Sequence, residues 1–299
     1  MTWNLAGRVK RLPEQTTLLL GLAADTICLQ ELTPTTLTAW AERLQDAGYH
    51  PLAAPHPGES RSRPLRVLTA AREPLHEIPV PGIPWSERVL AARLNDGSEI
   101  INVHSPISAK PDLAKIRTHE AVFAHLAQQA PRRLRVLCGD LNTPRKEHTD
   151  GTIWTFARDQ YGRLRPDRGE AWDHAELALI RRLHTYGFGD AYRQLNGCRQ
   201  RELSWEWPRW GGGYRLDHLL ISGPWQATSY RYLHPPRKAG LSDHSPLIAE
   251  LQRSARGAPA GSHRFPRREP GKNYSTSTHG RTTSHTSHTT SDQDGGHDG

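Results

Sequence analysis

Short apolar runs alternate with longer amphipathic segments from residue 1 to about residue 251. Asn95-Asp96-Gly97 is a strong hairpin-turn signal between two of the apolar runs. Apolar residues that recur every three or four positions predict helices over 15–24, 35–48, 114–129 and 172–186. Compact runs of branched apolar residues predict strands over 25–32, 65–71, 89–94, 99–103, 134–138, 214–221 and 245–251. The order of the elements predicts an α/β or α+β fold.

The pattern of apolar runs stops near residue 252. From Arg253 to Gly299, Ser, Thr, Gly, His and Arg dominate, and the aromatic residues are Phe265 and Tyr274. Such a segment buries too little apolar surface to offset its conformational entropy, so it is expected to be disordered. The sequence therefore predicts one folded domain over residues 1–251 and a disordered tail over residues 252–299.

The chain is basic, with a formal net charge of +8. The seven basic and four acidic residues of 253–299 account for +3, which leaves +5 on the predicted domain. Arginine supplies most of this charge, and its planar guanidinium matches phosphate oxygens, which favours a nucleic-acid partner. A GC-rich genome explains the arginines equally well. Residues 143–169 are polar and arginine-rich without periodicity, which predicts a long loop that contacts substrate or acts as a lid.

The chain has three cysteines, Cys28, Cys138 and Cys198. An odd and sparse count argues against a disulfide framework and favours a reducing compartment. No apolar run approaches the ~18 residues of a membrane-spanning helix, and the N-terminus shows no signal peptide. The sequence therefore predicts a soluble, cytoplasmic protein without a membrane partner.

Polar side chains stand where several of the apolar runs stop. Each such segment offers a carboxylate, carboxamide or imidazole. In chain order these segments are Thr2-Trp3-Asn4, Leu29-Gln30-Glu31, Asn102-Val103-His104-Ser105-Pro106, Cys138-Gly139-Asp140-Leu141-Asn142, Tyr214-Arg215-Leu216-Asp217-His218 and Leu241-Ser242-Asp243-His244-Ser245-Pro246. Any one of them arises by chance in most chains of this size, so only the ordered set is informative. Such a set is typical of an enzyme that gathers oxygen and nitrogen ligands around one metal ion and one phosphate.

Individual residues of this set suit particular tasks. Glu31 ends a buried run and needs a partner, either a hard cation or an arginine. Asp140 and Asn142 are two positions apart and are expected on one strand face. There a carboxylate can activate water and an amide can hold a phosphate oxygen, although an Asx-turn is the simpler alternative. His104 and His244 are candidates for contact with a phosphate, but a structural or surface histidine explains either one alone.

Taken together, residues 1 to about 251 resemble the endonuclease/exonuclease/phosphatase superfamily, which includes DNase I, exonuclease III and the inositol polyphosphate phosphatases. The resemblance implies a DNase I-like four-layer sandwich, with two packed mixed β-sheets and helices on the outside. Residues 189–193 and 204–217 are most similar to the exonuclease III branch. Ala6 and the segment from His104 to Pro106 depart from that branch, and the second resembles DNase-like and phosphatase-like members.

The resemblance also implies a role for each polar residue. The metal ion would be Mg²⁺, with Mn²⁺ as a possible substitute, and its ligands would be Glu31, Asn4 and Asp243. The catalytic set would comprise Asp140 to activate water, Asn142 to hold a phosphate oxygen, Asp217 to orient a histidine, and the two histidines His244 and His104. Substrate contacts would come from Trp205, Tyr214 and Arg215, with core packing as the alternative for Trp205.

These expectations point to a monomeric, metal-dependent phosphodiester hydrolase, a nuclease that cleaves DNA or RNA by in-line attack of an activated water. A phosphomonoesterase of the same superfamily, acting on an inositol phosphate, a lipid or a nucleotide, is the alternative. A catalytically inactive nucleic-acid-binding protein is the second alternative. The intact set of polar residues argues against it, since an inactive member has no reason to retain them all.

Overall fold

The computed structural model of the protein describes residues 1–56, 64–107, 113–128, 133–207, 209, 211–223 and 225–253. The predicted tail lies outside the described residues, apart from Gln252 and Arg253, which belong to the last strand. None of the helices within the described ranges is long and apolar enough to cross a membrane.

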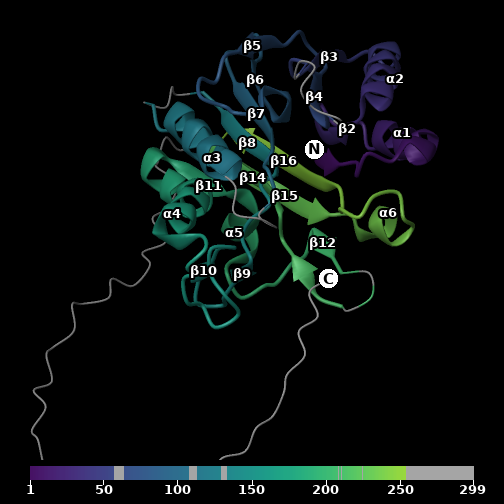
Figure 1. The fold of residues 1–299 in the computed structure, drawn as a ribbon. Coiled ribbons are helices and arrows are strands. Elements are labelled where there is room, and N and C mark those ends of the chain that lie inside the picture. Colours follow the sequence, from purple (N-terminus) through teal and green to yellow (C-terminus); the bar gives the residue numbers. More distant parts are fainter. Residues whose placement is uncertain are drawn as a thin grey trace, which may run out of the picture. The chain divides into compact units, whose positions relative to one another are not determined.

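Two six-stranded mixed β-sheets form the centre of the folded unit (Figure 1). The first sheet consists, in spatial order, of β15 (Trp225–Tyr232), β16 (Leu247–Arg253), β1 (Thr2–Asn4), β2 (Thr26–Leu32), β4 (Arg66–Ala71) and β3 (His50–Ala53). The second consists of β11 (Phe188–Asp190), β14 (Asp217–Ser222), β8 (Arg135–Asp140), β7 (Glu99–His104), β6 (Val89–Arg93) and β5 (His76–Ile78). The neighbours β1–β2 and β7–β8 are parallel, and the other neighbours are antiparallel.

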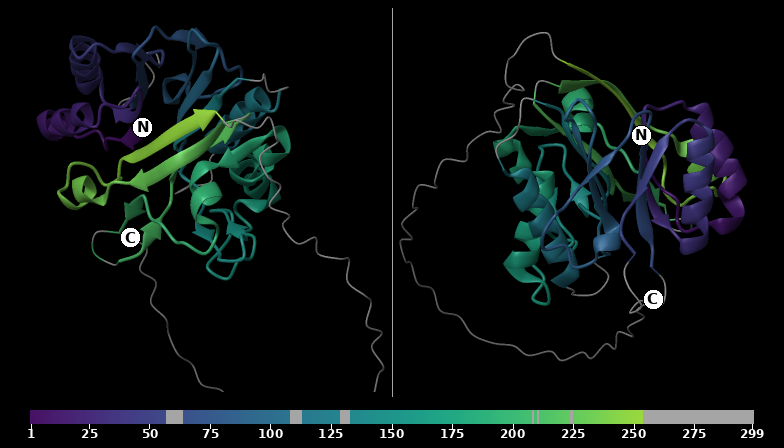
Figure 2. Two further views of the ribbon diagram at one scale, coloured as in Figure 1. Left: turned by 180° about the vertical axis from the view of Figure 1, so that it is seen from behind. Right: turned by 90° about the horizontal axis from the view of Figure 1, so that it is seen from above.

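Helices cover the outer faces of the sheets, as the view from above in Figure 2 shows. The helices are α1 (Leu12–Gly21), α2 (Pro34–Asp46), α3 (Leu113–Leu126), α4 (Gly169–Ile180), α5 (Ala191–Asn196) and α6 (His234–Lys238). Short 3-10 helices are η1 (Val9–Arg11), η2 (Ser86–Arg88) and η3 (Arg182–Tyr186). Two-stranded ribbons are β9 (Lys146–Glu147) with β10 (Ile153–Trp154), and β12 (Trp205–Glu206) with β13 (Gly213–Tyr214).

Three apolar clusters hold these layers together. One joins α1 and α2 to the first sheet through residues such as Leu19, Leu29 and Trp40. A second joins α3 and α4 to the second sheet. A third cluster contains Cys28 of the first sheet together with Cys138 of the second, so it lies between the two sheets. The fold is therefore the α/β sandwich of two packed mixed sheets with outer helices that the sequence predicted.

Local sequence explains why the predicted elements form. At α2, Thr33 and Thr36 form a reciprocal capping box, and Trp40 and Leu44 are buried at helical spacing. The predicted hairpin turn joins β6 to β7, where Gly97 adopts a φ of 80°. Every predicted helix and strand is present within a few residues of its predicted bounds, although 172–186 divides into α4 and η3. The elements that the pattern missed include β3, β5, β11, β15, α5 and α6.

The parallel pairs decide where polar side chains meet. The carboxyl ends of β1 and β2 carry Asn4 and Glu31, and those of β7 and β8 carry His104 and Asp140. Gly139 allows β7 and β8 to approach closely at this edge, because a Cβ there would lie 2.1 Å from the Val103 carbonyl oxygen. Both sheets therefore present their polar strand ends at one shared edge.

Candidate active site

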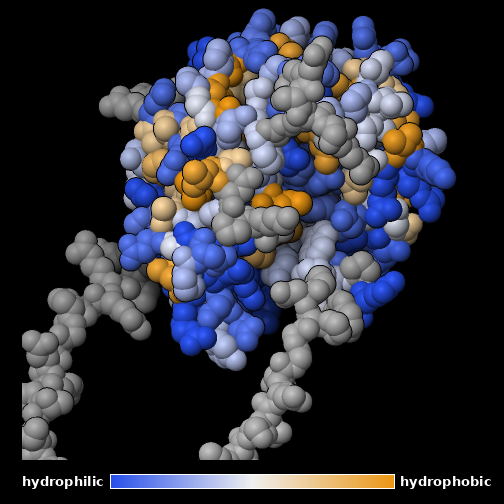
Figure 3. Space-filling view, viewed as in Figure 1, coloured by the Kyte–Doolittle hydropathy of each residue, from blue (hydrophilic) through white to orange (hydrophobic). Residues whose placement is uncertain are grey.

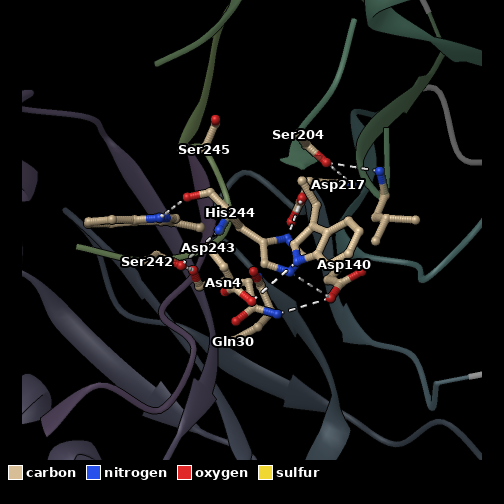
Figure 4. Close-up of polar contacts among 12 residues, drawn as sticks. Asn4, Gln30, Asp140, Ser204, Asp217, Ser242, Asp243, His244 and Ser245 are labelled. Atoms are coloured by element: carbon tan, nitrogen blue, oxygen red, sulfur yellow. Dashed lines mark hydrogen bonds and ion pairs between the residues drawn. The ribbon is translucent and has the colours of Figure 1, made fainter. Parts of the chain in front are cut away.

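Six of the predicted residues converge at this edge. Four of them, Asn4, Asp140, Asp217 and His244, are labelled in Figure 4. Asn4, Glu31, His104 and Asp140 come from the parallel strand ends, and Asp217 begins β14 directly opposite Asp140. His244 lies in the loop before β16, and the Trp3 indole donates to its carbonyl oxygen at 3.1 Å. The cluster therefore draws on elements more than 200 residues apart in the chain.

Asn4 lies between the carboxylates of Glu31 and Asp140. Its Nδ2 donates to Glu31 Oε1 at 3.0 Å and to Asp140 Oδ2 at 2.9 Å. Its Oδ1 accepts from the Ala6 amide at 2.9 Å. In this geometry Asn4 spaces and orients two carboxylates, and its predicted role as a metal ligand stays a prediction.

Asp217, His244 and Asp140 form a row of alternating charge. His244 Nδ1 lies 2.7 Å from Asp217 Oδ2, and His244 Nε2 lies 3.8 Å from Asp140 Oδ2. Burial alone would lower the pKa of His244, but the charges of Asp217 and Asp140 outweigh it and raise this pKa to about 10. His244 is therefore an imidazolium at neutral pH, with Nε2 on the side of Asp140.

Glu31 is aimed into the site by its backbone. A register shift between Leu29 and Leu32 marks a β-bulge, and Glu31 within it has a φ of 58°. His104 Nε2 lies 3.3 Å from Glu31 Oε1. Burial would raise the pKa of Glu31, but its contacts with His104 and Asn4 prevail and lower this pKa to about 2. Glu31 is thus a carboxylate at any physiological pH.

Asp140 and Asn142 lie together, but their relation is not that of one strand face. β8 ends at Asp140, and Asn142 has a φ of 49° in the left-handed region. The Asn142 amide donates to Asp140 Oδ1 at 2.9 Å, which is the Asx-turn that was the simpler alternative. Asn142 Nδ2 still lies 3.5 Å from Asp140 Oδ2 and donates to the Ser105 carbonyl at 2.8 Å. The turn and the shared site are therefore compatible.

Three serines that the sequence did not single out form hydrogen bonds with residues of the site or next to it. Ser204 Oγ accepts from the amides of Leu216 and Asp217, which holds the start of β14. Ser242 Oγ donates to the Asn4 carbonyl at 2.6 Å and accepts from the His244 amide at 3.0 Å. Ser245 Oγ lies 3.0 Å from Nδ1 of His234. In the sequence, only their place within or next to the polar segments could have indicated that these serines matter.

Asp243 is fixed by an aromatic group. Trp205 Nε1 donates to Asp243 Oδ2 at 3.2 Å. The Trp205 ring is parallel to Tyr214 at a centroid distance of 5.9 Å and meets Trp207 edge-on at 4.6 Å. Trp207 is 44% exposed. The β12–β13 ribbon therefore places Trp205 beside the predicted metal ligand and leaves Trp207 as the accessible aromatic surface.

Arg215 does not face the site as a free cation. Its side chain is 1% exposed and forms ion pairs with Glu147 at 2.7 Å and with Asp190. Glu147 also pairs with Arg193 at 2.8 Å. The predicted substrate contact of Arg215 is therefore replaced by a structural role, because burial demanded that its charge be compensated inside the protein.

The arginines of the 143–169 segment are also engaged within the protein. They donate to carbonyl or carboxylate oxygens of the same segment or of α4, and they are Arg145, Arg158, Arg163, Arg165 and Arg168. Hydrophilic residues dominate the surface over β9 and β10 in the lower part of Figure 3. The segment is polar as predicted, but its arginines form hydrogen bonds that hold the segment together and tie it to α4.

The donor set at the strand ends suits a hard divalent cation. Glu31, His104 and Asp140 form one compact group, and Asp140, Asp217 and His244 form another that shares Asp140. Asp217 Oδ1 and Asp243 Oδ1 are buried and have no hydrogen-bond partner among the described residues. Oxygen donors of this kind are the ligands that Mg²⁺ and Mn²⁺ prefer. The residues present therefore fit a metal ion at the group that Glu31, His104 and Asp140 form.

Residues 1–244 match the model of the Endonuclease/Exonuclease/phosphatase family. The chain belongs to this family. Its members are hydrolytic, metal-dependent phosphoesterases and include both nucleases and phosphatases. The predicted resemblance is thus confirmed. No curated protein matches the sequence.

Solved structures of the family share the fold. An AP endonuclease from Archaeoglobus fulgidus has a TM-score of 0.63 and 21% identity, over 83% of this chain and 97% of that one. The 3' phosphatase NExo from Neisseria, bound to a product DNA hairpin, has a TM-score of 0.61 and 23% identity, over 84% and 98%. Humanized D. rerio TDP2 has a TM-score of 0.58 and 16% identity, over 84% and 97%. At these identities the likeness establishes the DNase I-like fold.

Proposed function

We propose that this protein is a divalent-metal-dependent phosphodiester hydrolase that cleaves nucleic acid by in-line attack of water. The observation that carries the proposal is the row formed by Asp217, His244 and Asp140. It places an imidazolium 3.8 Å from a buried carboxylate, so a proton acceptor and a cation stand side by side at the strand ends. A phosphoryl group that faces both of them would meet the base and the charge that its transition state requires.

Each residue has a definite task in this proposal. Asp140 takes the proton of the attacking water, and burial raises the pKa of Asp140, which makes it the stronger base. His244 donates from Nε2 to a non-bridging phosphate oxygen and offsets the negative charge of the transition state. Asn142 and His104 donate to further phosphate oxygens. Asp217 holds the His244 ring in place through Nδ1.

Glu31 and Asp243 would hold the metal ion, and Asn4 would keep Glu31 and Asp140 in position. When bound, Mg²⁺, or Mn²⁺ in its place, polarises the phosphoryl oxygen and stabilises the leaving oxyanion. The charges of the site agree with this assignment, because Glu31 is held as a carboxylate and Asp243 has an unpaired buried oxygen.

Nucleic acid is the substrate that the surroundings of the site support. Trp207, Trp205 and Tyr214 form an aromatic ribbon next to Asp243, and a base beside the scissile phosphate can stack on its exposed member. The fold is shared with an AP endonuclease and with a 3' phosphatase bound to DNA.

A phosphomonoesterase is the second candidate. The observation that favours it is that each arginine in 143–169 forms a hydrogen bond within the protein, although Arg163 and Arg165 stay exposed. A small phosphorylated molecule needs few such contacts.

A substrate panel separates the two candidates. Plasmid, single-stranded DNA, an abasic oligonucleotide, RNA, an inositol phosphate and p-nitrophenyl phosphates are each incubated with Mg²⁺ and with EDTA. Asp140→Asn, purified in the same way, controls for contaminating nucleases. The proposal expects Mg²⁺-dependent cleavage of a polynucleotide that weakens as salt rises. Turnover of small monoesters alone, insensitive to salt, supports the second candidate.

A further inference from the structure

A buried ion pair lies against the backbone of Asn142. Lys115 of α3 and Glu176 of α4 are each 1% exposed, and Lys115 Nζ lies 2.9 Å from Glu176 Oε1. The same Nζ donates to the Asn142 carbonyl oxygen at 2.6 Å. A charged group from an outer helix thus reaches the segment that carries a proposed phosphate ligand.

Glu176 extends the contact to the next residue. Its Oε2 accepts from Thr143 Oγ1 at 2.6 Å and from the Phe156 amide at 2.9 Å, while its Oε1 accepts from Trp172 Nε1 at 2.7 Å. From the other side, His218 Nε2 lies 2.8 Å from the Thr143 carbonyl oxygen. Residues 142–143 are therefore held from α3, α4 and β14 at once.

This segment needs such support because of its backbone. β8 ends at Asp140, so the sheet ladder does not hold Asn142. Asn142 adopts a φ of 49°, in the left-handed region that asparagine tolerates better than most residues but that is still less favourable than the right-handed one, so contacts with the surroundings help to hold it there. If this conformation relaxed, the carboxamide would turn away from Ser105 and Asp140.

Stability alone does not account for the ion pair. Burying two opposite charges carries a desolvation cost that their attraction only partly offsets, so a neutral pair of similar size would serve the core about as well. A neutral pair lacks the charge-assisted hydrogen bond from Lys115 to the Asn142 carbonyl. Retaining the charges therefore fits a role in geometry.

We infer that Lys115 and Glu176 are positioning residues, which hold Asn142 in its left-handed conformation and thereby aim its carboxamide at the substrate phosphate. The expected effect of this ion pair on kcat rests on the proposed function, whereas its effect on the backbone conformation of Asn142 is independent of that function.

The double variant Lys115→Met with Glu176→Gln tests this role, since it removes both charges without leaving one of them buried alone. The kcat on the best substrate of the panel should fall by about 10- to 100-fold, as expected for a misplaced contact, with KM and the melting temperature little changed. The matched control is Arg158→Met with Asp173→Asn. That pair, 2.6 Å apart, also ties the 143–169 segment to α4 but has no contact with Asn142, and its removal should leave kcat near the wild-type value.

A second readout does not depend on activity. A residue with positive φ shows a strong NMR cross-relaxation peak between its own amide and Hα protons, because these lie close together. Asn142 should show this peak in the wild type and in the control and lose it in the Lys115/Glu176 variant. If the Lys115/Glu176 variant loses the peak and the wild type cleaves none of the substrates, the proposed function is wrong and the positioning role stands.

Other results overturn the positioning role. It is wrong if the Lys115/Glu176 variant keeps both the peak and kcat. It is also wrong if the control pair lowers kcat as much, because then general ordering of the loop is what matters. Should the double variant not fold, Lys115→Leu with Glu176→Gln decides, since it also removes both charges together and keeps an acceptor for Thr143 and Phe156. An unchanged peak and kcat in that variant also overturn the inference.

Discussion

Replacing Asp217 by asparagine removes the charge that keeps His244 protonated. Asparagine has nearly the same shape and can still accept the Nδ1 proton, so the ring orientation is preserved. The variant therefore isolates the electrostatic part of the interaction, and His244→Gln serves as the reference for complete loss of the imidazolium.

The size of the effect follows from the geometry of the row. The pKa of His244 is raised from 6.5 to about 10. At about 1.36 kcal/mol per unit, this difference corresponds to about 5 kcal/mol in favour of the charged ring. Burial acts in the opposite direction, and Asp217, at 2.7 Å, is the largest of the charges that overcome it. With Asp140 as the main remaining partner and burial still opposing the charge, the pKa of His244 should fall, and more of the ring should be neutral at pH 8.

Two measurements follow the change. NMR titration of the His244 ring in EDTA should show the pKa fall by several units in the variant. At pH 8 with Mg²⁺, kcat should fall by about 10²–10⁴, the range for acid–base groups, and activity should recover partly toward lower pH as the ring regains its proton. The reasoning would be refuted by a variant whose His244 still titrates near pH 10, or by one that keeps wild-type kcat at pH 8.

Three further predictions concern the metal ion, acid stability and the tail. Glu31→Gln should lose most activity and bind Mn²⁺ more weakly by calorimetry, because the site loses its main anionic oxygen donor; full activity of the wild type in EDTA would contradict this. Burial would raise the pKa of Glu147, but Arg215 and Arg193 outweigh it and lower this pKa to about 2, and they also hold the pKa of Asp190 below its usual range. Because the folded pKa values are depressed, the stability they contribute is present above about pH 4 and is lost as the pH falls toward 2, so the melting temperature should drop over this window and drop less in Glu147→Gln. Deleting residues 254–299 should leave the melting temperature unchanged, because their composition offers little apolar burial, whereas a fall of many degrees would show that they pack on the domain.

Much of the fold could be predicted because its signals are local. The capping residues of α2, the Asn95-Asp96-Gly97 turn and the buried runs of β2 and β8 each lie within a few neighbouring positions. The missed strand β15 shows where this fails, since its exposed and buried residues follow no clean alternation. Its pairing with β16 across a bulge stabilises it, and such pairing depends on a distant segment.

The candidate site divides in the same way. The polar residues at strand ends were visible in the sequence, since six such segments follow one another in order along the chain. The role of each residue was not visible. Arg215 lies in a buried ion pair and the side-chain oxygen of Asn4 accepts from a backbone amide, because the direction of a side chain and the partners it meets are set by packing. Lys115 and Glu176, on two outer helices, gave no signal at all.

The sequence by itself determined the family, the order of the elements and the set of polar residues that meet at the site, because these follow from patterns within short stretches of chain. Only the tertiary structure decided which carboxylate faces His244, which oxygens remain unpaired for a cation, and which charges are consumed inside the protein. These properties depend on distances between groups far apart in the chain and on the removal of water around them, and neither exists until the two sheets have packed together.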